Sequence, residues 1–301
     1  MSSPWIQALR SVSLNLPDLD KAETFYTQVW KLSVVAREPG VIYLRGTGPD
    51  HHLLAIHQGG DQAQIRHVTL RARSREALDS IEQAAVQAGG SIVAPIAALD
   101  DPAGGTGLTL RDPDGRLIQV VHGDRQHSDA HPGTDSPIRL AHAVLNASNV
   151  PGAQAFFVQA LGFRLVDRTR IMAFLNCDAD HHSIALGDTD NNALNHIAFL
   201  MPELEAVMRG GGRMKDAGHG IEWGPGRHGP GNNAFNYFID PFGVVIEYTA
   251  DVQQIGDDYR VGTPDDWKWP AGRVDHWGIS AAPSARLKEA QRAVFFVPST
   301  P

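Results

Sequence analysis

Residues 228–247 read HGPGNNAFNYFIDPFGVVIE, and this stretch decides how the rest of the chain folds. It predicts a loop rich in glycine and asparagine, a short strand, an Asp-Pro-Phe-Gly turn and a second strand. The second strand, residues 244–249, carries one charged residue, Glu247, in its middle. A carboxylate in a buried strand is costly unless it is paired or binds a metal ion. The rest of the chain must therefore supply a partner for Glu247.

The composition is that of a globular protein that buries a full hydrophobic core. The 301 residues suffice for one large domain or two ordinary ones, and 42% are hydrophobic and 20% charged. The formal net charge of -8 offers no basic surface to nucleic acid and argues against an anionic membrane as a partner. No run of 18 apolar residues predicts a membrane span, and the opening Met1-Ser-Ser-Pro-Trp does not resemble a signal peptide.

The cysteine and histidine content bears on location and chemistry. The single cysteine, Cys177, cannot form an internal disulfide, which fits a reducing cytoplasm. Fourteen histidines is a high number for this length. Several lie in polar stretches, where we expect solvated side chains, namely His51, His52, His127 and His131.

The second half of the chain repeats the first. Phe156-Phe157 follows Phe25-Tyr26 by 131 residues, and the turn at 240–243 follows the Asp-Pro-Asp-Gly turn at 112–115 by 128. In each half a strand (10–16 or 141–146) precedes a helix and further strands, and a polar break at 123–137 separates the halves. This pattern predicts an α+β fold of two tandem domains. In each domain, paired β-α-β-β-β modules form a curved, partly closed sheet around a funnel.

Two histidines of the second half occupy strand positions comparable to that of Glu247. His142 and His196 each lie inside a predicted strand, where the repeat makes them equivalent to inward-facing residues. Two imidazoles and one carboxylate are the ligands of the facial triad, which holds Fe(II) and leaves coordination sites open. A single histidine in a strand is more often a hydrogen-bonded core residue. Three matched positions instead favour a metal site formed by His142, His196 and Glu247.

The first half serves as an internal comparison. Its equivalents are Ser11, His67 and Gln119, at offsets of 131, 129 and 128 residues. Serine and an amide replace one histidine and the carboxylate, so this copy is predicted to hold no metal. We therefore expect a non-metal-binding domain over residues 1–125, a catalytic metal-binding domain over 126–252 and a tail over 253–301. Trp267, Trp269 and Trp277 of the tail lie among prolines and glycines, which suggests an ordered cover.

The motif Gly226-x-His228…Tyr237-x-x-Asp240-Pro-x-Gly243-x-x-x-Glu247 is close to a family signature. Together with the repeat, it resembles the type I extradiol ring-cleavage dioxygenases of the vicinal oxygen chelate superfamily. The resemblance spans about residues 8 to 280, and it departs at Asn236, where the signature has an apolar residue. It implies a cytoplasmic homo-oligomer that uses Fe(II), less often Mn(II), in aromatic catabolism. Such an enzyme inserts both atoms of O₂ into a catechol, next to the hydroxyls, and yields a muconate-semialdehyde-type product.

The resemblance also assigns roles beyond the metal ligands. Strand alternation puts His181 and His182 on opposite faces, and the family match selects His182 as the catalytic acid or base. His228 and Tyr237 match the pair that hydrogen-bonds the substrate oxygens. The alternative is that His228 only solvates the glycine-rich loop and that Tyr237 only packs.

A few positions bear on the substrate. Val144 and Phe174 are apolar and are predicted to line the pocket. Relatives that take carboxylated substrates have an arginine five residues before the His228 position, where this chain has Trp223. These residues favour a catechol with an apolar substituent, and ordinary core packing is the alternative.

Three other functions compete with ring cleavage. A glyoxalase-like isomerase or thiol transferase usually draws ligands from both repeats, for which Ser11 and Gln119 are poorly suited. A non-enzymatic small-molecule-binding protein of the same fold would not need Glu247 in an apolar strand. An inactive paralogue kept for assembly would not need the intact ligand set.

Overall fold

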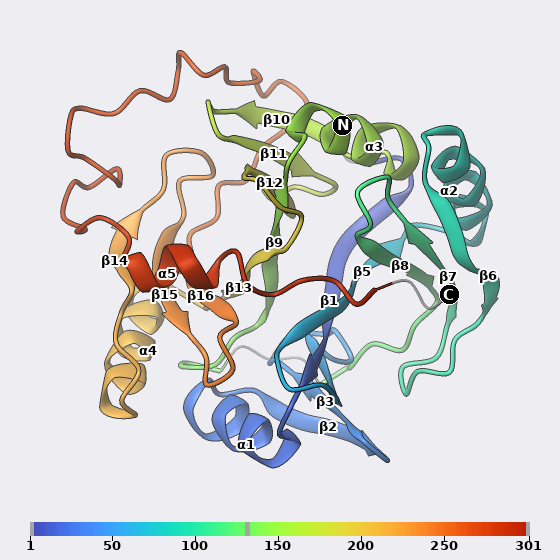
Figure 1. Cartoon of the computed structure of the whole chain (residues 1–301), viewed down its shortest axis with the longest axis horizontal. Coiled ribbons are helices and arrows are strands. Elements are labelled where there is room, and N and C mark those ends of the chain that lie inside the picture. The colour runs from blue at the N-terminus through green and yellow to red at the C-terminus, as the bar shows by residue number, and fades with distance from the viewer. Residues whose placement is uncertain (1–2, 130–132, 299–301) are drawn as a thin grey trace.

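The computed structural model describes residues 3–129 and 133–298, and it confirms the predicted α+β fold of two tandem domains. Two eight-stranded sheets carry helices packed beside them (Figure 1). The first sheet consists of β1 (Ile6–Leu16), β2 (Ser33–Glu38), β3 (Val41–Arg45), β4 (Leu54–Gln58), β5 (Gln64–Ala72), β6 (Ser91–Ala98), β7 (Thr106–Arg111) and β8 (Leu117–His122). The second consists of β9 (Arg139–Ala147), β10 (Arg164–Arg168), β11 (Met172–Asn176), β12 (Ile184–Asp188), β13 (Leu194–Leu200), β14 (Trp223–Arg227), β15 (Ala234–Ile239) and β16 (Val245–Ala250). The helices are α1 (Leu19–Thr24), the π-helix η1 (Phe25–Val29), α2 (Arg75–Gln87), α3 (Val150–Leu161), α4 (Leu204–Asp216) and α5 (Ala285–Ala290).

The two sheets share one topology. Their strand orders are β2-β3-β4-β1-β5-β8-β7-β6 and β10-β11-β12-β9-β13-β16-β15-β14. The pairs β1–β4, β5–β8, β9–β12 and β13–β16 are parallel, and the other neighbours are antiparallel. Within the described chain the edge strands of each sheet do not pair with each other, so neither sheet closes into a barrel. The sheets fall within residues 6–122 and 139–250, and the boundaries 1–125, 126–252 and 253–301 stay a prediction.

The helices begin at capping side chains that the sequence indicates. Ser74 Oγ accepts a hydrogen bond from Ala77 N at the start of α2, and Asn149 Oδ1 accepts one from Gly152 N at the start of α3. The apolar spacing from Ala22 through Val29 predicts one helix that opens at Pro17, whereas in the structure α1 gives way after Thr24 to the π-helix η1. The sequence also did not predict β2 and β6. Both are edge strands with mostly exposed or half-buried side chains, so they lack the alternation that reveals a strand.

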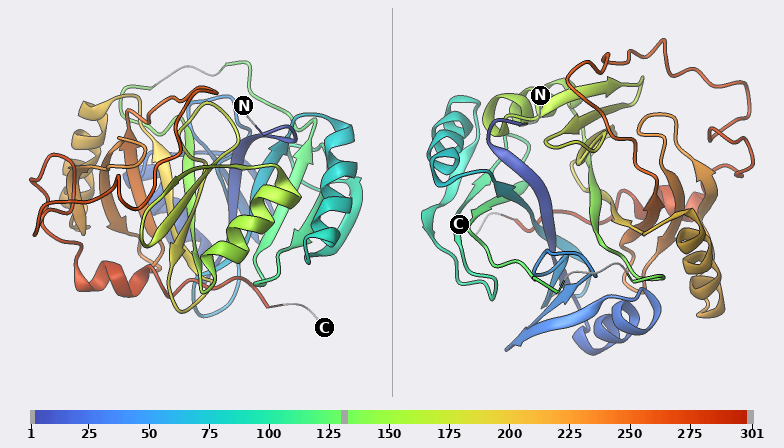
Figure 2. Two further views of the ribbon diagram at one scale, coloured as in Figure 1. Left: turned by 90° about the horizontal axis from the view of Figure 1, so that it is seen from above. Right: turned by 180° about the vertical axis from the view of Figure 1, so that it is seen from behind.

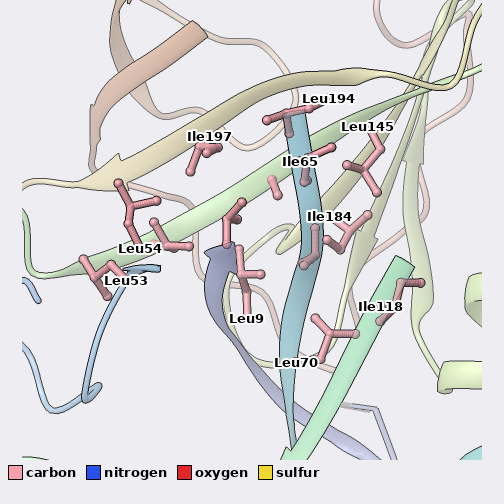
Figure 3. Packing of buried hydrophobic residues seen from close by; sticks show 14 of the residues in the cluster. Leu9, Leu53, Leu54, Ile65, Leu70, Ile118, Leu145, Ile184, Leu194 and Ile197 are labelled. Carbon is pink, nitrogen blue, oxygen red and sulfur yellow. The ribbon is translucent and has the colours of Figure 1, made fainter. Parts of the chain in front are cut away.

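Side chains of the central strands alternate between two environments. Leu145 and Ile197 of the second sheet belong to the main hydrophobic core. Figure 3 shows them gathered with Leu9, Ile65 and Ile118 of the first sheet. The core therefore lies between the two sheets, and the opposite face of the second sheet is free to form a site.

The two halves also interlock through the segment that follows α1. The Trp30 ring stacks on the ring of Tyr248 in β16, with centroids 3.6 Å apart, and Tyr248 Oη donates to the Trp30 carbonyl. Arg213 of α4 donates to the carbonyl of Val29, and Tyr26 Oη donates to Asp240 Oδ2. Figures 1 and 2 accordingly show α1 near α4, and α2 beside α3. The turn at Asp240 is therefore fixed in part by the first half of the chain.

The expectation that His51 and His52 are solvated was wrong. Both are 1% exposed, and the residue before them, Asp50, forms a β-bridge with Gln126. His127 is partly buried and its ring stacks on that of His51, whereas His131 lies outside the described residues. Within the described residues, no helix has the length and apolar character needed to cross a membrane.

Candidate metal centre

Strand pairing brings His142, His196 and Glu247 to one face of the second sheet. Ala198 of β13 pairs with His142 of β9 on one side and with Glu247 of β16 on the other. Residues two apart on a strand share a face, so His196 lies on the same face as Ala198. All three side chains are buried, and their ligand atoms form the only such cluster among the described residues.

The donor atoms are spaced as ligands of a single ion. His142 Nε2 lies 3.1 Å and His196 Nε2 lies 3.2 Å from Glu247 Oε2. Two ligands about 2.1 Å from an ion and at right angles to each other are roughly 3.0 Å apart. Spacing and donor chemistry therefore fit a divalent metal such as iron or manganese, and a metal-binding triad is present.

Two asparagines that the sequence analysis missed hold the triad in place. Asn195 Oδ1 lies 2.8 Å from His196 Nδ1, and accepting its proton leaves the Nε2 lone pair facing Glu247. Asn233 Nδ2 donates to Thr249 Oγ1 and lies 3.5 Å from Glu247 Oε1. His142 Nδ1 is buried, with no partner in the described chain. The first half has Arg66 where Asn195 stands, so the repeat gave no signal for this residue.

The electrostatics of the triad favour a cation. Burial alone would raise the pKa of Glu247, but the imidazoles of His142, His196 and His228 hold it well below its usual range. Burial lowers the pKa of His196 to about 4, although Glu247 acts in the opposite direction. At neutral pH the Glu247 carboxylate therefore faces a neutral His196 imidazole, which is the protonation state in which these two residues bind a metal.

His182 lies beside the triad, but not for the reason given by strand alternation. β12 begins at Ile184, so His181 and His182 precede the strand and diverge at a bend. The ring of His182 lies 4.4 Å from that of His142 and lines a cavity. The ring of His181 points away, with Nε2 2.8 Å from Asp167 Oδ2.

His228 and Tyr237 form a hydrogen-bonded pair on the other side of the triad. His228 Nε2 lies 3.0 Å from Tyr237 Oη, which in turn lies 3.4 Å from His196 Nε2. The His228 ring also stacks on Phe235 at the end of the glycine-rich loop. His228 therefore both packs against an aromatic ring and hydrogen-bonds to Tyr237. Burial and the charge of Glu247 raise the pKa of Tyr237 well above its ordinary value, so its hydroxyl stays protonated.

A cavity of about 530 Å³ opens in front of these residues. Val144, Phe174 and Trp223, the three residues predicted to line the pocket, all border it. Trp267 and Trp269 also border it, and both rings lie against Gly229. The Trp-rich tail therefore forms part of the wall, a placement that its composition suggested only in general terms.

The first sheet carries a different arrangement at the equivalent place. Thr69 pairs with Ser11 on one side and Gln119 on the other, which reproduces the pairing around Ala198. The buried guanidinium of Arg10 lies here, with Nη1 donating to Ser11 Oγ and lying 2.6 Å from His52 Nε2. The first sheet therefore has the Arg10 guanidinium, a fixed positive charge, next to the position that corresponds to the metal ligand His142.

Fold and site together define a protein of the vicinal oxygen chelate type, with a metal-binding triad in its second sheet. A family model described as the Glyoxalase/Bleomycin resistance protein/Dioxygenase superfamily matches residues 8–120 and 139–248. The two matches cover most of the chain and fall on the two sheets. The chain therefore belongs to this superfamily.

Named relatives narrow the comparison. Metapyrocatechase 2 of Cupriavidus necator is 29% identical, over 89% of this chain and 85% of its own. A manganese-dependent 2,3-dihydroxybiphenyl 1,2-dioxygenase of Geobacillus genomosp. 3 is 23% identical, over 76% of this chain and 80% of its own. The crystal structure of the Mn(II)-bound glyoxalase from Novosphingobium aromaticivorans is 31% identical, with a TM-score of 0.86, and the match covers 95% and 94% of the two chains. The dioxygenases confirm the resemblance predicted from the sequence, and the relatives as a set do not favour iron over manganese.

Proposed function

We propose that this chain is an extradiol dioxygenase that uses Fe(II), with Mn(II) as the alternative, to open a catechol ring beside its hydroxyls. The product is a muconate semialdehyde or its ketone analogue. The observation that carries the proposal is the convergence of His142, His196 and Glu247 on one face, with His182 and Tyr237 bordering the same cavity. Relatives named as catechol-cleaving enzymes support it.

The triad is suited to a diol. When bound, the ion would supply Lewis acidity toward two vicinal hydroxyls and the redox chemistry that dioxygen requires. Glu247 is the one anionic group of the triad, so a divalent ion would leave the site with a net positive charge. Such a site attracts a deprotonated catechol.

His182 is suited to receive the proton that the diol gives up. Burial, together with the imidazoles of His142 and His181, lowers its pKa well below the ordinary value, so the side chain is neutral at neutral pH. A neutral imidazole bordering the cavity serves as a general base and can later return the proton as an acid. Tyr237 and His228 would hydrogen-bond the substrate oxygens from the opposite side.

The cavity wall favours an alkyl or aryl substituent on the catechol. Val144, Phe174 and Trp223 are apolar or aromatic, and the volume of about 530 Å³ exceeds what a single ring needs. Substrate binding would therefore draw on apolar burial beside Val144, Phe174 and Trp223, while Arg170 and Lys288 border the cavity elsewhere.

The proposal is tested by anaerobic loading with Fe(II) or Mn(II), followed by a panel of substituted catechols in the presence of O₂. We expect a yellow product and O₂ uptake with each turnover, most efficiently for apolar substituents. His182→Phe should retain metal and catechol binding while kcat falls at least about 100-fold, because the acid/base group is lost. Unchanged turnover in this variant would remove His182 from its role.

The similarity to the Mn(II)-bound glyoxalase of Novosphingobium aromaticivorans supports a second candidate, an isomerase of the glyoxalase type. The same metal-loaded samples can be assayed with a thiohemiacetal in place of a catechol. Isomerisation without O₂ uptake would replace the proposed function by this one. A cytoplasmic location and a homo-oligomeric state both stay predictions. Light scattering of the purified protein tests the oligomeric state.

A further inference from the structure

A second buried carboxylate lies behind the proposed catalytic histidine. Asp167 of β10 is fully buried, although the two ends of its short strand are polar. Its Oδ1 accepts a hydrogen bond from Gly262 N at 2.7 Å, and its Oδ2 lies 2.8 Å from His181 Nε2. Tyr259 Oη donates to the same Oδ2 at 3.1 Å. Two contacts from the tail therefore hold this carboxylate against His181.

The chain of contacts continues from His181 to His182. The Nδ1 atoms of the two rings are 3.1 Å apart, and the rings are nearly perpendicular at 87°. Since His182 turns Nδ1 toward His181, its Nε2 is the nitrogen on the cavity side. Asp167 does not reach the cavity, and it acts on His182 only through His181.

The positions of the protons follow from the ends of this chain. A carboxylate only accepts hydrogen bonds, so His181 carries its proton on Nε2 and presents a lone pair at Nδ1. The Nδ1 of His182 must then carry a proton and donate it to His181. The Nε2 of His182 is left with a free lone pair toward the cavity, which is the form that a general base requires.

The first sheet shows the same histidine pair without the carboxylate. His51 and His52 repeat the contact, with Nδ1 atoms 3.0 Å apart and rings at 84°. Ala36 pairs with Tyr43 just as Asp167 pairs with Phe174, so an alanine stands where Asp167 stands in the second sheet. The histidine pair is therefore common to both sheets, whereas a carboxylate at the Asp167 position is found only in the sheet that carries the metal triad.

We propose that Asp167 is a positioning residue that fixes the tautomer of His182 through His181, so that the unprotonated Nε2 faces the substrate. The inference rests on the proposed function for the role of His182. The tautomer itself is a property of the chain that is measured without any reaction.

The test is long-range ¹H–¹⁵N NMR of the histidine rings in the full-length chain, metal-free and loaded with diamagnetic Zn(II). In the unmodified chain we expect His182 to carry its proton on Nδ1. In Asp167→Asn, Gly262 N still requires an acceptor, so the amide nitrogen faces His181 and donates to it. The proton pattern then reverses, and His182 carries its proton on Nε2.

The same variant is measured by steady-state kinetics with the metal and catechol identified in the panel. We expect kcat to fall about 100-fold or more, with KM within about threefold and metal content unchanged. Tyr259→Phe removes one hydrogen bond to the same carboxylate oxygen and should keep the original tautomer. His51→Gln disturbs the equivalent pair in the first sheet and should leave kcat unchanged.

An Nε2 proton on His182 in the unmodified chain would overturn the inference without any variant. An unchanged tautomer in Asp167→Asn would also overturn it, as would a kcat equal to that of the unmodified chain. A reversed tautomer in a chain that shows no ring cleavage would instead sustain the positioning role and overturn the proposed function.

Discussion

Glu247 and Gln119 stand at equivalent places in two copies of one sheet and differ only in an amide for a carboxylate oxygen. Each lies beside the central strand of its sheet, opposite Ala198 or Thr69. Gln119 carries no charge, and its Oε1 accepts a hydrogen bond from Thr69 Oγ1. Glu247 keeps its charge in full burial, which is costly unless a cation is close. Comparing Glu247 with Gln119 therefore shows the effect of the charge alone, because the two side chains have nearly the same shape.

Glu247→Gln should therefore weaken metal binding by at least about 100-fold, because the only anionic ligand is lost while the side-chain volume is kept. Metal content after equilibrium dialysis, measured by plasma mass spectrometry, checks this. The matched control is Gln119→Glu, which should not add a second ion because Ser11 offers no imidazole. Full occupancy of Glu247→Gln would contradict the ligand assignment.

At this scale the sequence predicts the triad but not the residues that orient it. The repeat aligned His142, His196 and Glu247 with a copy that lacks the ligands, and this made them visible without knowledge of the fold. Asp167 is also a buried acid, but it lies in a half-buried edge strand, and it escaped the same argument. Arg164 and Arg168 at the ends of that strand make it look solvent-exposed.

At the scale of elements, the C-terminal tail is the part that sequence patterns describe least. It bridges to the second sheet at Asp180 and later at Leu194, and then to the first sheet at Ile65. Over residues 253–298 its one helix, α5, has six residues, and most of this segment has no regular structure. Tryptophans among prolines and glycines indicated an ordered segment. The wall that they form depends on contacts with Gly229 that no local pattern encodes.

Trp267→Ala should raise KM for aryl-substituted catechols about 10-fold and change kcat much less. The substitution removes aromatic wall area worth about 1–2 kcal/mol of binding and leaves the triad intact. The control is Trp277→Ala, since that ring is partly exposed and packs over the guanidinium of Arg227. Steady-state kinetics with catechol and an aryl catechol measure both variants. Equal KM values for Trp267→Ala and the unmodified chain would show that this ring does not contact the substrate.

At the scale of the whole molecule, the two copies of the sheet differ in role: the second carries the metal triad, and the first packs against it. The core lies between the sheets, and Trp30 of the first half stacks on Tyr248 of the second, so neither half is packed independently. The topology follows from the repeat and was predictable. The burial of His51 and His52 was not, because their partners are distant in the sequence: His52 contacts Arg10, 42 residues earlier, and His51 contacts Arg125. The molecule consequently buries several histidines in neutral form.

These histidines set the pH dependence of stability. Burial lowers the pKa of His51, His57 and His196 to about 4 and that of His67 to about 3. In the unfolded chain each titrates near 6.5, so between pH 6.5 and 4 the unfolded state binds protons that the folded state does not. Stability is then present above pH 6.5 and is lost as the pH falls.

Two carboxyl groups act in the opposite direction over part of this range. Burial raises the pKa of Asp178 and of Asp240 to about 6. As the pH falls, these groups therefore take up protons in the folded chain before they do so in the unfolded chain. Both groups are half protonated in the folded chain near pH 6, and they are two against the four histidines named above. The net effect of acid down to pH 4.5 is therefore destabilising, because throughout this range the unfolded chain binds more protons than the folded chain.

We expect the melting temperature of the metal-free chain to fall by about 5 °C or more from pH 7 to pH 4.5. Scanning calorimetry at matched ionic strength measures this. Because the chain is metal-free, loss of a bound metal ion cannot account for a fall in the melting temperature. His67→Gln serves as the matched variant, because His67 lies in the sheet without the triad and its loss should flatten the profile. A melting temperature that stays constant or rises toward pH 4.5 would show that these imidazoles take up protons in the folded state, and burial would then not keep them neutral.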